Sequence, residues 1–376
     1  MANAVGIIFS SLNTNTLSRL TGDRTVAAIP FGCRYRLVDF CLSNMVNADI
    51  SNIFVVANYN YRSLLQHIGS GKDWDLARRK SGINFISPFQ TAANSSDAKM
   101  FSTRLEALKS MRSSINEFTE DYVVMMDSDN VLNIDLGSVI DDHEKSGANI
   151  TLVTMGVNKN FSSKHPRMML SSVAGKVTDI SMSDKYDERH PDLSLGIFVM
   201  KTVYLRRLIE EAIAYNLSSL TEFMLKNCKS SSYKAIKYSG YVATVSSFLD
   251  YYRCSMDLVN DRGARDNLFG NKDARIFTRV HNSSPSVYKS SANVVNSMIA
   301  DDCVIEGTVI NSVLFRGVKV ERGAVVKNSV LFSGTHIGQD ASVNCIVADK
   351  NVYVSDSVNL SGNDNMPFYI QKSRKV

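Results

Sequence analysis

Paired cysteines and histidine pairs at metal-binding spacing are both missing from this sequence. Six cysteines lie scattered along 376 residues without a CxxC motif, so neither a zinc site nor a redox motif is indicated. No apolar run approaches the roughly 18–20 residues that span a bilayer, and the N-terminus lacks the basic and apolar segments of a secretion signal. These absences predict a soluble protein of the cytoplasm that keeps its thiols reduced and binds no membrane.

A strong excess of charge is also missing. The 42 lysines and arginines outnumber the 37 aspartates and glutamates by only five, which is too mild an excess to predict binding to nucleic acid. It is compatible with small anionic ligands such as sugar phosphates without requiring them. Hydrophobic residues make up 44% and charged residues 21% of the chain, an ordinary globular composition over a length sufficient for two or three domains.

Glycine is missing from the first loop. The apolar run Ala4–Phe9 predicts a strand, and the loop that follows it, residues 10–17, contains no glycine. In α/β proteins the corresponding turn is commonly rich in glycine, because glycine lets backbone N–H groups close around a phosphate. This loop therefore lacks the residues of a phosphate-binding turn.

Further short apolar runs predict more strands of the same kind. They do not alternate with polar residues, which is typical of strands buried on both faces of a mostly parallel sheet: Ile53–Ala57, Tyr122–Met126 and Ile150–Met155. Apolar residues at helical spacing over residues 105–115, and the segment Leu136–Lys145, predict helices between them. This alternation predicts an open α/β sheet with its ligands at the carboxyl ends of the strands.

The C-terminal segment contains an internal repeat. Four units begin with asparagine, at spacings of 15, 17 and 16 residues: Asn296, Asn311, Asn328 and Asn344. Apolar residues recur within each unit at regular steps. Such a repeat predicts a parallel β-helix in which the asparagines occupy turns and stack in a ladder. A loose β-sandwich is the alternative.

A long string in the first domain carries a family resemblance. Residues 30–47 read PFGCRYRLVDFCLSNMVN, and they resemble the motif PFGG-[KR]-Y-R-L-[IV]-D-F-x-LSN-x-x-N of the ADP-glucose pyrophosphorylases. These are the glucose-1-phosphate adenylyltransferases of bacterial glycogen and plant starch synthesis. The resemblance covers nearly the whole chain and implies a Rossmann-like nucleotidyltransferase domain with a mostly parallel sheet, followed by a left-handed parallel β-helix.

The domain boundaries follow from the resemblance together with a polar stretch between the two parts. Residues 260–285 are polar and contain glycine, asparagine and proline, which favours a linker. We expect an α/β domain over residues 1–255, a linker over 256–288 and a β-helix over 289–376.

The resemblance implies that the nucleotide loop of the family is substituted in this chain. The family loop reads GGxGTRL, and its glycines fall on Ser11, Leu12 and Thr14, while its arginine falls on Thr16. The lysine of the family segment RAKPAVPF falls on Val26. Both changes remove a cation that would contact phosphate through charge-assisted hydrogen bonds.

The metal positions implied by the resemblance are only half retained. The family's strand-end Gly-Asp-His matches residues 128–130, so Asp129 remains as a vestigial metal ligand, whereas the second metal aspartate is replaced by Thr244. A single carboxylate holds Mg²⁺ weakly. We therefore expect no required cofactor, and Mg²⁺ only together with residual nucleotide binding. The GTADA segment of the family is also changed, to residues 102–106.

Two arginines of the string are candidates for binding an anion. In the family, the basic residue that matches Arg34 belongs to the allosteric anion region, and Arg36 lies two residues further on. We expect these two residues to bind a sugar phosphate or inorganic phosphate as an effector. The alternative is that both form structural salt bridges at the surface.

Together these substitutions predict a catalytically inactive, regulatory subunit of glucose-1-phosphate adenylyltransferase. It would modulate a catalytic paralogue in a hetero-oligomer, a tetramer, in bacterial glycogen biosynthesis. One alternative is a weakly active sugar-phosphate nucleotidyltransferase with a rearranged site, in which Arg19 or Arg24 replaces the lost arginine. Others are a free-standing phosphometabolite sensor and a β-helix acyltransferase, for which His336 is the histidine of the repeat region.

Overall fold

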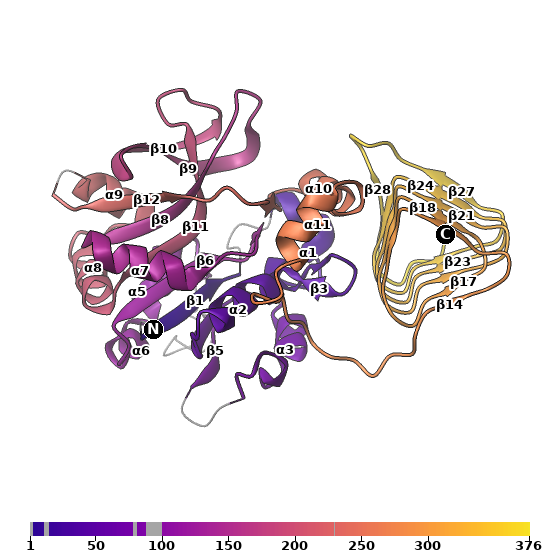
Figure 1. Ribbon diagram of the computed structural model, residues 1–376, viewed down its shortest axis with the longest axis horizontal. Coiled ribbons are helices and arrows are strands. Elements are labelled where there is room, and N and C mark those ends of the chain that lie inside the picture. The colour runs from indigo at the N-terminus through magenta and orange to yellow at the C-terminus, as the bar shows by residue number, and fades with distance from the viewer. Residues whose placement is uncertain (1–2, 11–14, 78–80, 88–99, 229) are drawn as a thin grey trace.

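The computed structural model describes residues 3–10, 15–77, 81–87, 100–228 and 230–376. Three of the predicted loop positions, Ser11, Leu12 and Thr14, lie outside this described part. The chain forms an α/β domain and a β-helix that lie next to each other and are joined by an extended segment (Figure 1).

A mixed sheet forms the centre of the α/β domain. Among the described residues it has nine strands in the order β5-β4-β1-β6-β11-β8-β12-β10-β9. Their bounds are β1 (Ala4–Phe9), β4 (Asn52–Val56), β5 (Gly82–Ile86), β6 (Tyr122–Asp127), β8 (Ile150–Gly156), β9 (Ser162–Val173), β10 (Lys176–Lys185), β11 (Asp192–Lys201) and β12 (Tyr233–Lys237). The strands β5, β4, β1 and β6 are mutually parallel, and β8 is parallel to β12. In contrast, β11 is antiparallel to β6 and β8.

The predicted α/β class is confirmed, and the apolar runs overlap β1, β4, β6 and β8. All six residues of β1 are buried, as expected for a central strand covered on both faces. The antiparallel half includes the long hairpin of β9 and β10. Many residues of these two strands are polar and partly exposed, so they lack the apolar runs that identify the buried strands.

Helices cover both faces of the sheet. On one face the apolar core includes side chains from α5 (Arg104–Ser110), α6 (Arg112–Asn116), α8 (Thr202–Ala214) and α9 (Leu220–Asn227). On the other face it includes side chains from α2 (Leu37–Asn47), α3 (Arg62–Ile68) and α7 (Leu136–Ser146). Within the described residues, no helix has the length and apolar character needed to cross a membrane.

Side-chain caps determine where several helices begin. Thr103, Asp135, Ser219 and Ser247 each accept a hydrogen bond from the backbone N–H three residues further on, at the starts of α5, α7, α9 and α10 (Phe248–Asn260). Short hydroxyl and carboxylate side chains are favoured there because they satisfy N–H groups that the helix leaves unpaired.

The family string forms a small hairpin and then helix α2. Strands β2 (Pro30–Phe31) and β3 (Tyr35–Arg36) pair with each other, and Asp39 accepts a hydrogen bond from the Arg36 backbone at the start of α2. Helix α2 is buried from residue 37 to residue 45. Its side chains contribute both to the core under the sheet and to the core beside the β-helix. A helix that is buried on two sides tolerates few substitutions, which explains why the residue pattern of this string is so specific.

Part of the predicted linker is helical. Helix α10 crosses residue 255, and α11 (Arg262–Phe269) follows directly. Only Ala264 and Leu268 of α11 are buried, so its sequence is as polar as that of a linker. The segment without helix or strand is confined to residues 270–286, and the first β-helix strand begins at Val287.

The C-terminal part is a parallel β-helix, as predicted. Three sheets of five parallel strands each form its walls within the described residues. The first contains β14 (Val287–Tyr288), β17 (Val304–Ile305), β20 (Lys319–Val320), β23 (His336–Ile337) and β26 (Tyr353–Val354). The second contains β15 (Asn293–Val295), β18 (Thr308–Ile310), β21 (Val325–Lys327), β24 (Ser342–Asn344) and β27 (Asn359–Ser361). The third contains β16 (Met298–Ile299), β19 (Val313–Leu314), β22 (Val330–Leu331), β25 (Ile346–Ala348) and β28 (Phe368–Ile370).

The predicted asparagine ladder is present, with one correction to its register. Asn296 donates to Asn311 at 2.8 Å, Asn311 to Asn328 at 3.4 Å, and Asn328 to Asn344 at 3.0 Å. The first three asparagines have positive φ, but in the fourth coil the residue with positive φ is Cys345. The repeat is therefore aligned one residue later there than the sequence alignment placed it. Asn344 is the last residue of β24, from which its side chain still reaches the ladder.

The two domains share an apolar core. One cluster of buried side chains combines α10, α11 and the loop region around Ile29 with β-helix residues such as Phe315 and Phe332. The rings of Tyr251 and Phe332 meet edge to face, with their centroids 6.1 Å apart. Beside this cluster, Arg24 donates to Asp349 at 2.8 Å, and both side chains are at most 3% exposed. The β-helix therefore packs against the α/β domain through buried surface.

Candidate functional site

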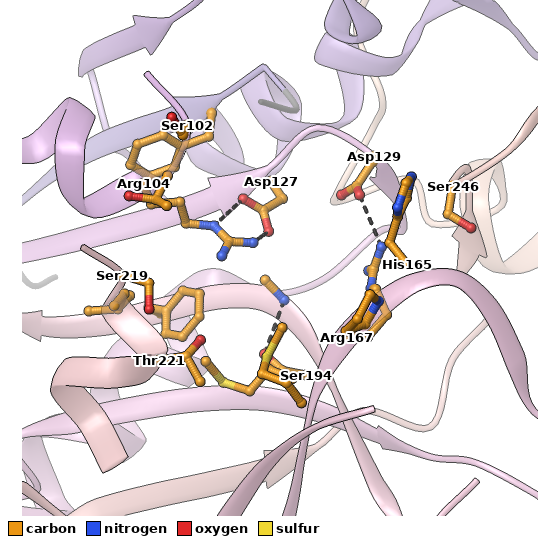
Figure 2. A pocket seen from close by; sticks show the side chains of 18 of the residues that line it. Ser102, Arg104, Asp127, Asp129, His165, Arg167, Ser194, Ser219, Thr221 and Ser246 are labelled. Carbon is orange, nitrogen blue, oxygen red and sulfur yellow. Dashed lines mark hydrogen bonds and ion pairs between the residues drawn. The ribbon is translucent and has the colours of Figure 1, made fainter. Parts of the chain in front are cut away.

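A cavity of about 330 Å³ lies at the carboxyl ends of β1 and β6 (Figure 2). Its walls come from the starts of α5 and α9, from β9 and from β11. This is the edge at which open α/β sheets bind their ligands, so the location agrees with the sequence-based expectation. Hydroxyl groups of Ser102, Thr103, Ser194, Ser219 and Thr221 line it together with apolar side chains and two arginine–aspartate pairs.

The first pair joins Arg104, at the start of α5, to Asp127, at the end of β6. The Arg104 Nε donates to Asp127 Oδ1 at 2.7 Å, and its Nη2 donates to the other carboxylate oxygen. Burial alone would lower the pKa of the guanidinium, but the attraction of Asp127 outweighs it and the pKa of Arg104 is raised. Burial raises the pKa of Asp127, and Arg104 opposes that shift. Arg104 thus occupies both oxygens of this carboxylate.

Gly196 makes room for this first pair. It lies at an irregularity of β11, where the register shifts between Ser194 and Ile197, and its φ is +70°. A Cβ atom at Gly196 would overlap the carboxylate of Asp127. Both the backbone conformation and the close approach therefore require glycine here.

The second pair joins the predicted metal ligand Asp129 to Arg167 of β9. The Arg167 Nη1 donates to Asp129 Oδ2 at 3.1 Å, and each side chain is 15% exposed. Figure 2 shows the two side chains facing each other across the cavity from the first pair. Because the carboxylate of Asp129 is paired with a guanidinium, the retained aspartate already has a cationic partner within the chain.

Thr244, at the second predicted metal position, belongs to the same network. Strand β13 (Ala243–Thr244) pairs with β7 (Asn130–Val131), which places Thr244 opposite Asn130. The Thr244 hydroxyl donates to Asn130 Oδ1 at 2.8 Å, and Arg167 Nη2 lies 3.4 Å from the same oxygen. Thus the structure brings together both predicted metal positions, but around an arginine. The described residues contain no group of three or more His, Cys, Asp or Glu that could hold a metal ion.

Thr16, at the position of the family's arginine, forms side-chain hydrogen bonds with two residues that are distant in the sequence, Ser246 and His165. Its hydroxyl donates to the backbone oxygen of Ser246 at 2.6 Å. A hydroxyl has one proton, so the 2.9 Å contact with His165 Nε2 is one in which the imidazole donates. Thr16 therefore connects α1 (Ser18–Thr21) and its preceding turn to β9 at one side of the cavity.

Val26, at the position of the family's lysine, lies away from solvent. It is fully buried in the apolar core shared by the two domains. A lysine at this site would need a carboxylate partner or an open path to water. The environment of Val26 is therefore that of a core residue.

The two candidate anion-binding arginines differ in their surroundings. Arg34 is exposed, with its guanidinium 6.0 Å from the centre of the Tyr35 ring. Arg36 is half-buried and donates to the backbone oxygen and the hydroxyl of Ser63 at 2.7 and 2.9 Å. Burial, with repulsion from Arg24 and Arg279, lowers the pKa of Arg36 to about 10 against the attraction of Asp39.

Lys350 shares the electrostatic environment of Arg36, and the sequence analysis did not single it out. Burial, with repulsion from Arg36 and Arg24, lowers its pKa to about 8, although Asp349 opposes the shift. Cations that repel one another in a partly buried region favour an anion between them. The only sequence signal was a lysine in a β-helix turn, which is ordinary for an exposed coil.

Matches to protein families cover both domains. Residues 5–181 match the nucleotidyl transferase family, and residues 282–367 match the GlmU-like C-terminal hexapeptide family. The fold and the position of the cavity agree with these matches, and they define a nucleotidyl transferase domain followed by a hexapeptide β-helix.

Curated relatives match most of the length of the chain. The glycogen biosynthesis protein GlgD of Bacillus subtilis (strain 168) is 31% identical over 372 residues, which is 98% of this chain and 95% of that protein. GlgD of Geobacillus stearothermophilus is 33% identical over 86% of this chain and 82% of that protein. The glucose-1-phosphate adenylyltransferase of Mycoplasma mobile is 27% identical over 86% of this chain and 84% of that protein. The chain belongs to the family that contains GlgD and the glucose-1-phosphate adenylyltransferases.

Proposed function

We propose that this chain is a catalytically inactive, regulatory subunit of glucose-1-phosphate adenylyltransferase in bacterial glycogen biosynthesis. In this proposal it works in the cytoplasm, in a hetero-oligomer, a tetramer, with a catalytic paralogue. The relatives support the pathway, because two are named glycogen biosynthesis proteins and another is named glucose-1-phosphate adenylyltransferase. The substituted positions around the cavity support inactivity.

One observation supports inactivity above all others. At the positions where the family has an arginine, a lysine and a second carboxylate, this chain has Thr16, Val26 and Thr244, and all three are engaged within the chain. Phosphoryl transfer depends on positive charge that offsets charge on the phosphates. Loss of a single electrostatic stabiliser typically costs about 10²–10³ in kcat, so several losses together favour a chain without useful turnover.

The first test is enzymatic. The purified chain, given ATP, glucose 1-phosphate and saturating Mg²⁺, should form no ADP-glucose above background. Co-expressed with a catalytic paralogue, it should change the maximal rate or the effector response of that paralogue. The paralogue expressed alone is the control.

Two results would point to the other functions. Turnover by the isolated chain would favour a weakly active nucleotidyltransferase with a rearranged site. An effector response without any partner subunit would favour a free-standing phosphometabolite sensor.

Regulation by an anion is the second part of the proposal. The region around Arg34 and Arg36 would bind a sugar phosphate or inorganic phosphate as effector. Its support is that burial, together with repulsion from neighbouring cations that include Arg24, lowers the pKa of both Arg36 and Lys350. An anion placed among them would relieve that repulsion.

The second test uses sulfate, whose charge is constant between pH 6.5 and 9. Sulfate affinity, measured by calorimetry, should fall as the pH rises through about 8, because Lys350 loses its proton there. A Lys350→Gln variant should bind roughly tenfold more weakly at pH 7, the loss expected for one charge-assisted hydrogen bond, and should lose the pH dependence. Arg34→Ala should also weaken binding.

The matched control is Lys319→Gln, which removes an exposed lysine from the same β-helix and should leave sulfate affinity unchanged. Equal affinity at pH 7 and pH 9 in the native chain, or no change in the Arg34 and Lys350 variants, would contradict the effector site.

A further inference from the structure

The cavity at the carboxyl ends of β1 and β6 is called the cleft from here on. The position of Arg167 explains how the charge of Asp129 in this cleft is neutralised. Strand β9 runs along one side of the cavity and carries Arg167 on the same side as the two predicted metal positions. Its guanidinium contacts the carboxylate of Asp129 at 3.1 Å and the amide oxygen of Asn130 at 3.4 Å. Figure 2 shows Arg167 extending toward Asp129.

The side chains around Asp129 do not fit a divalent cation. Mg²⁺ takes octahedral oxygen ligands at about 2.0–2.1 Å, and the oxygens here are already engaged. Asp129 Oδ2 accepts from Arg167, and the Asn130 oxygen accepts from Thr244. The neighbouring carboxylate of Asp127 is bound through both oxygens by Arg104. A dication beside Asp129 would also be repelled by the guanidinium next to it.

The substitution at the second predicted metal position and the arginine that lies beside it compensate each other in charge. A divalent cation held by two carboxylates is neutral overall. A single carboxylate with a single guanidinium is neutral as well. Replacing the second carboxylate by Thr244 and supplying Arg167 therefore preserves the local charge balance without a metal.

We propose that Arg167 is the resident cation of this cleft, in place of a divalent metal, and that the cleft binds its ligand independently of metal. The inference rests on the proposed function, because it concerns the same site, and it deepens that function by excluding metal-chelated nucleoside triphosphates as ligands. A ligand of this cleft would contact a fixed guanidinium instead of a metal ion.

The test measures binding of Mn²⁺ to the full chain by electron paramagnetic resonance of the free ion. The native chain should show no saturable binding at millimolar Mn²⁺. Thr244→Asp alone should bind weakly, because Arg167 still occupies Asp129. The double variant Arg167→Gln with Thr244→Asp should bind Mn²⁺ at least tenfold more tightly than Thr244→Asp alone.

Two further variants separate charge from shape. Arg167→Lys with Thr244→Asp keeps a cation and should bind Mn²⁺ as weakly as Thr244→Asp alone. Arg112→Gln with Thr244→Asp removes an arginine from an exposed ion pair with Glu210 and should behave like Thr244→Asp. Thermal unfolding of each variant verifies that it is folded, and the lysine variant retains the charge that the native fold has at this position.

Several outcomes would overturn the inference. They are saturable Mn²⁺ binding by the native chain, equal affinity in Thr244→Asp and the glutamine double variant, and tight binding by the lysine variant. None of these outcomes requires a partner subunit or turnover. A native chain that binds Mn²⁺ but makes no ADP-glucose would therefore overturn this inference alone, whereas a native chain that makes ADP-glucose would overturn the proposed function.

Discussion

An Asp349→Ala variant should lose about 3–5 kcal/mol of unfolding free energy, the range measured when one partner of a buried ion pair is removed. Arg24 donates to both oxygens of Asp349, at 2.8 and 3.0 Å, from the other domain. Burial would lower the pKa of Arg24, but Asp349 and Asp23 raise it, so the guanidinium remains charged. Without Asp349 its principal partner is gone, while the residue itself is only 2% exposed. Urea unfolding monitored by circular dichroism gives the measurement.

Two controls identify the source of this loss. Replacing both partners, Arg24→Met with Asp349→Leu, removes the unpaired charge and should be much less damaging than the single change. Lys159→Ala breaks an ion pair whose members are 79% and 74% exposed, and it should change stability by less than about 1 kcal/mol. If Asp349→Ala is no more destabilising than Lys159→Ala, the pair between the domains contributes little.

The Gly196→Ala variant should lose about 2–5 kcal/mol of unfolding free energy, from two separate causes. A residue with a Cβ in the left-handed region costs about 1–2 kcal/mol, and φ of Gly196 is +70°. The added methyl group would also overlap the Asp127 carboxylate, and such overpacking costs about 1–3 kcal/mol. Denaturant unfolding measures the sum.

The control for the glycine variant is Gly147→Ala. Gly147 ends helix α7 with φ of +62°, and a Cβ there would meet nothing within 4 Å. This variant should show only the conformational cost, so the difference between the two alanine variants reports the contact with Asp127. Equal losses in the two variants would mean that the carboxylate moves aside at no cost.

The sequence was most informative where one segment packs against several neighbouring parts of the structure. The string of residues 30–47 includes a helix buried against the sheet on one side and against the core beside the β-helix on the other. Few sequences meet both requirements, so the string predicted the family and, through it, both domains. The β-helix was also predictable, because each coil repeats the same apolar and turn positions.

The charged network of the cleft was much harder to predict. Asp129 and Thr244 were recognised as metal positions, yet Arg104 and Arg167 were given no role, although they hold the two aspartates of the cleft. Arg104 lies 23 residues from Asp127 in the sequence, and Arg167 lies 38 residues from Asp129. Strand β9, which carries Arg167, has the alternating exposure of a surface strand. Local patterns contain no information on such pairings, which depend on the order of strands in the sheet.

The helix within the expected linker and the shifted register of the fourth coil have local physical causes. Helix α11 buries only two side chains, so a polar linker and a polar helix have nearly the same composition. In the fourth β-helix coil, Cys345 takes the left-handed conformation that asparagine takes in the preceding coils. Asparagine adopts that conformation readily, and Asn344 directly precedes the true position, which explains the displacement by one residue.

The asparagine ladder has a consequence for how this chain can change its length during evolution. Asn296 and Asn311 are 15 residues apart, and Asn311 and Asn328 are 17 apart, yet the side chains still meet. The two extra residues fall between β20 and β21, because residues 321–324 form a turn where the preceding coil has only residues 306–307. Insertions and deletions are thus admitted at that corner of the β-helix. The corner with the ladder fixes the register, since a coil that slipped there would lose its amide contacts to both neighbours.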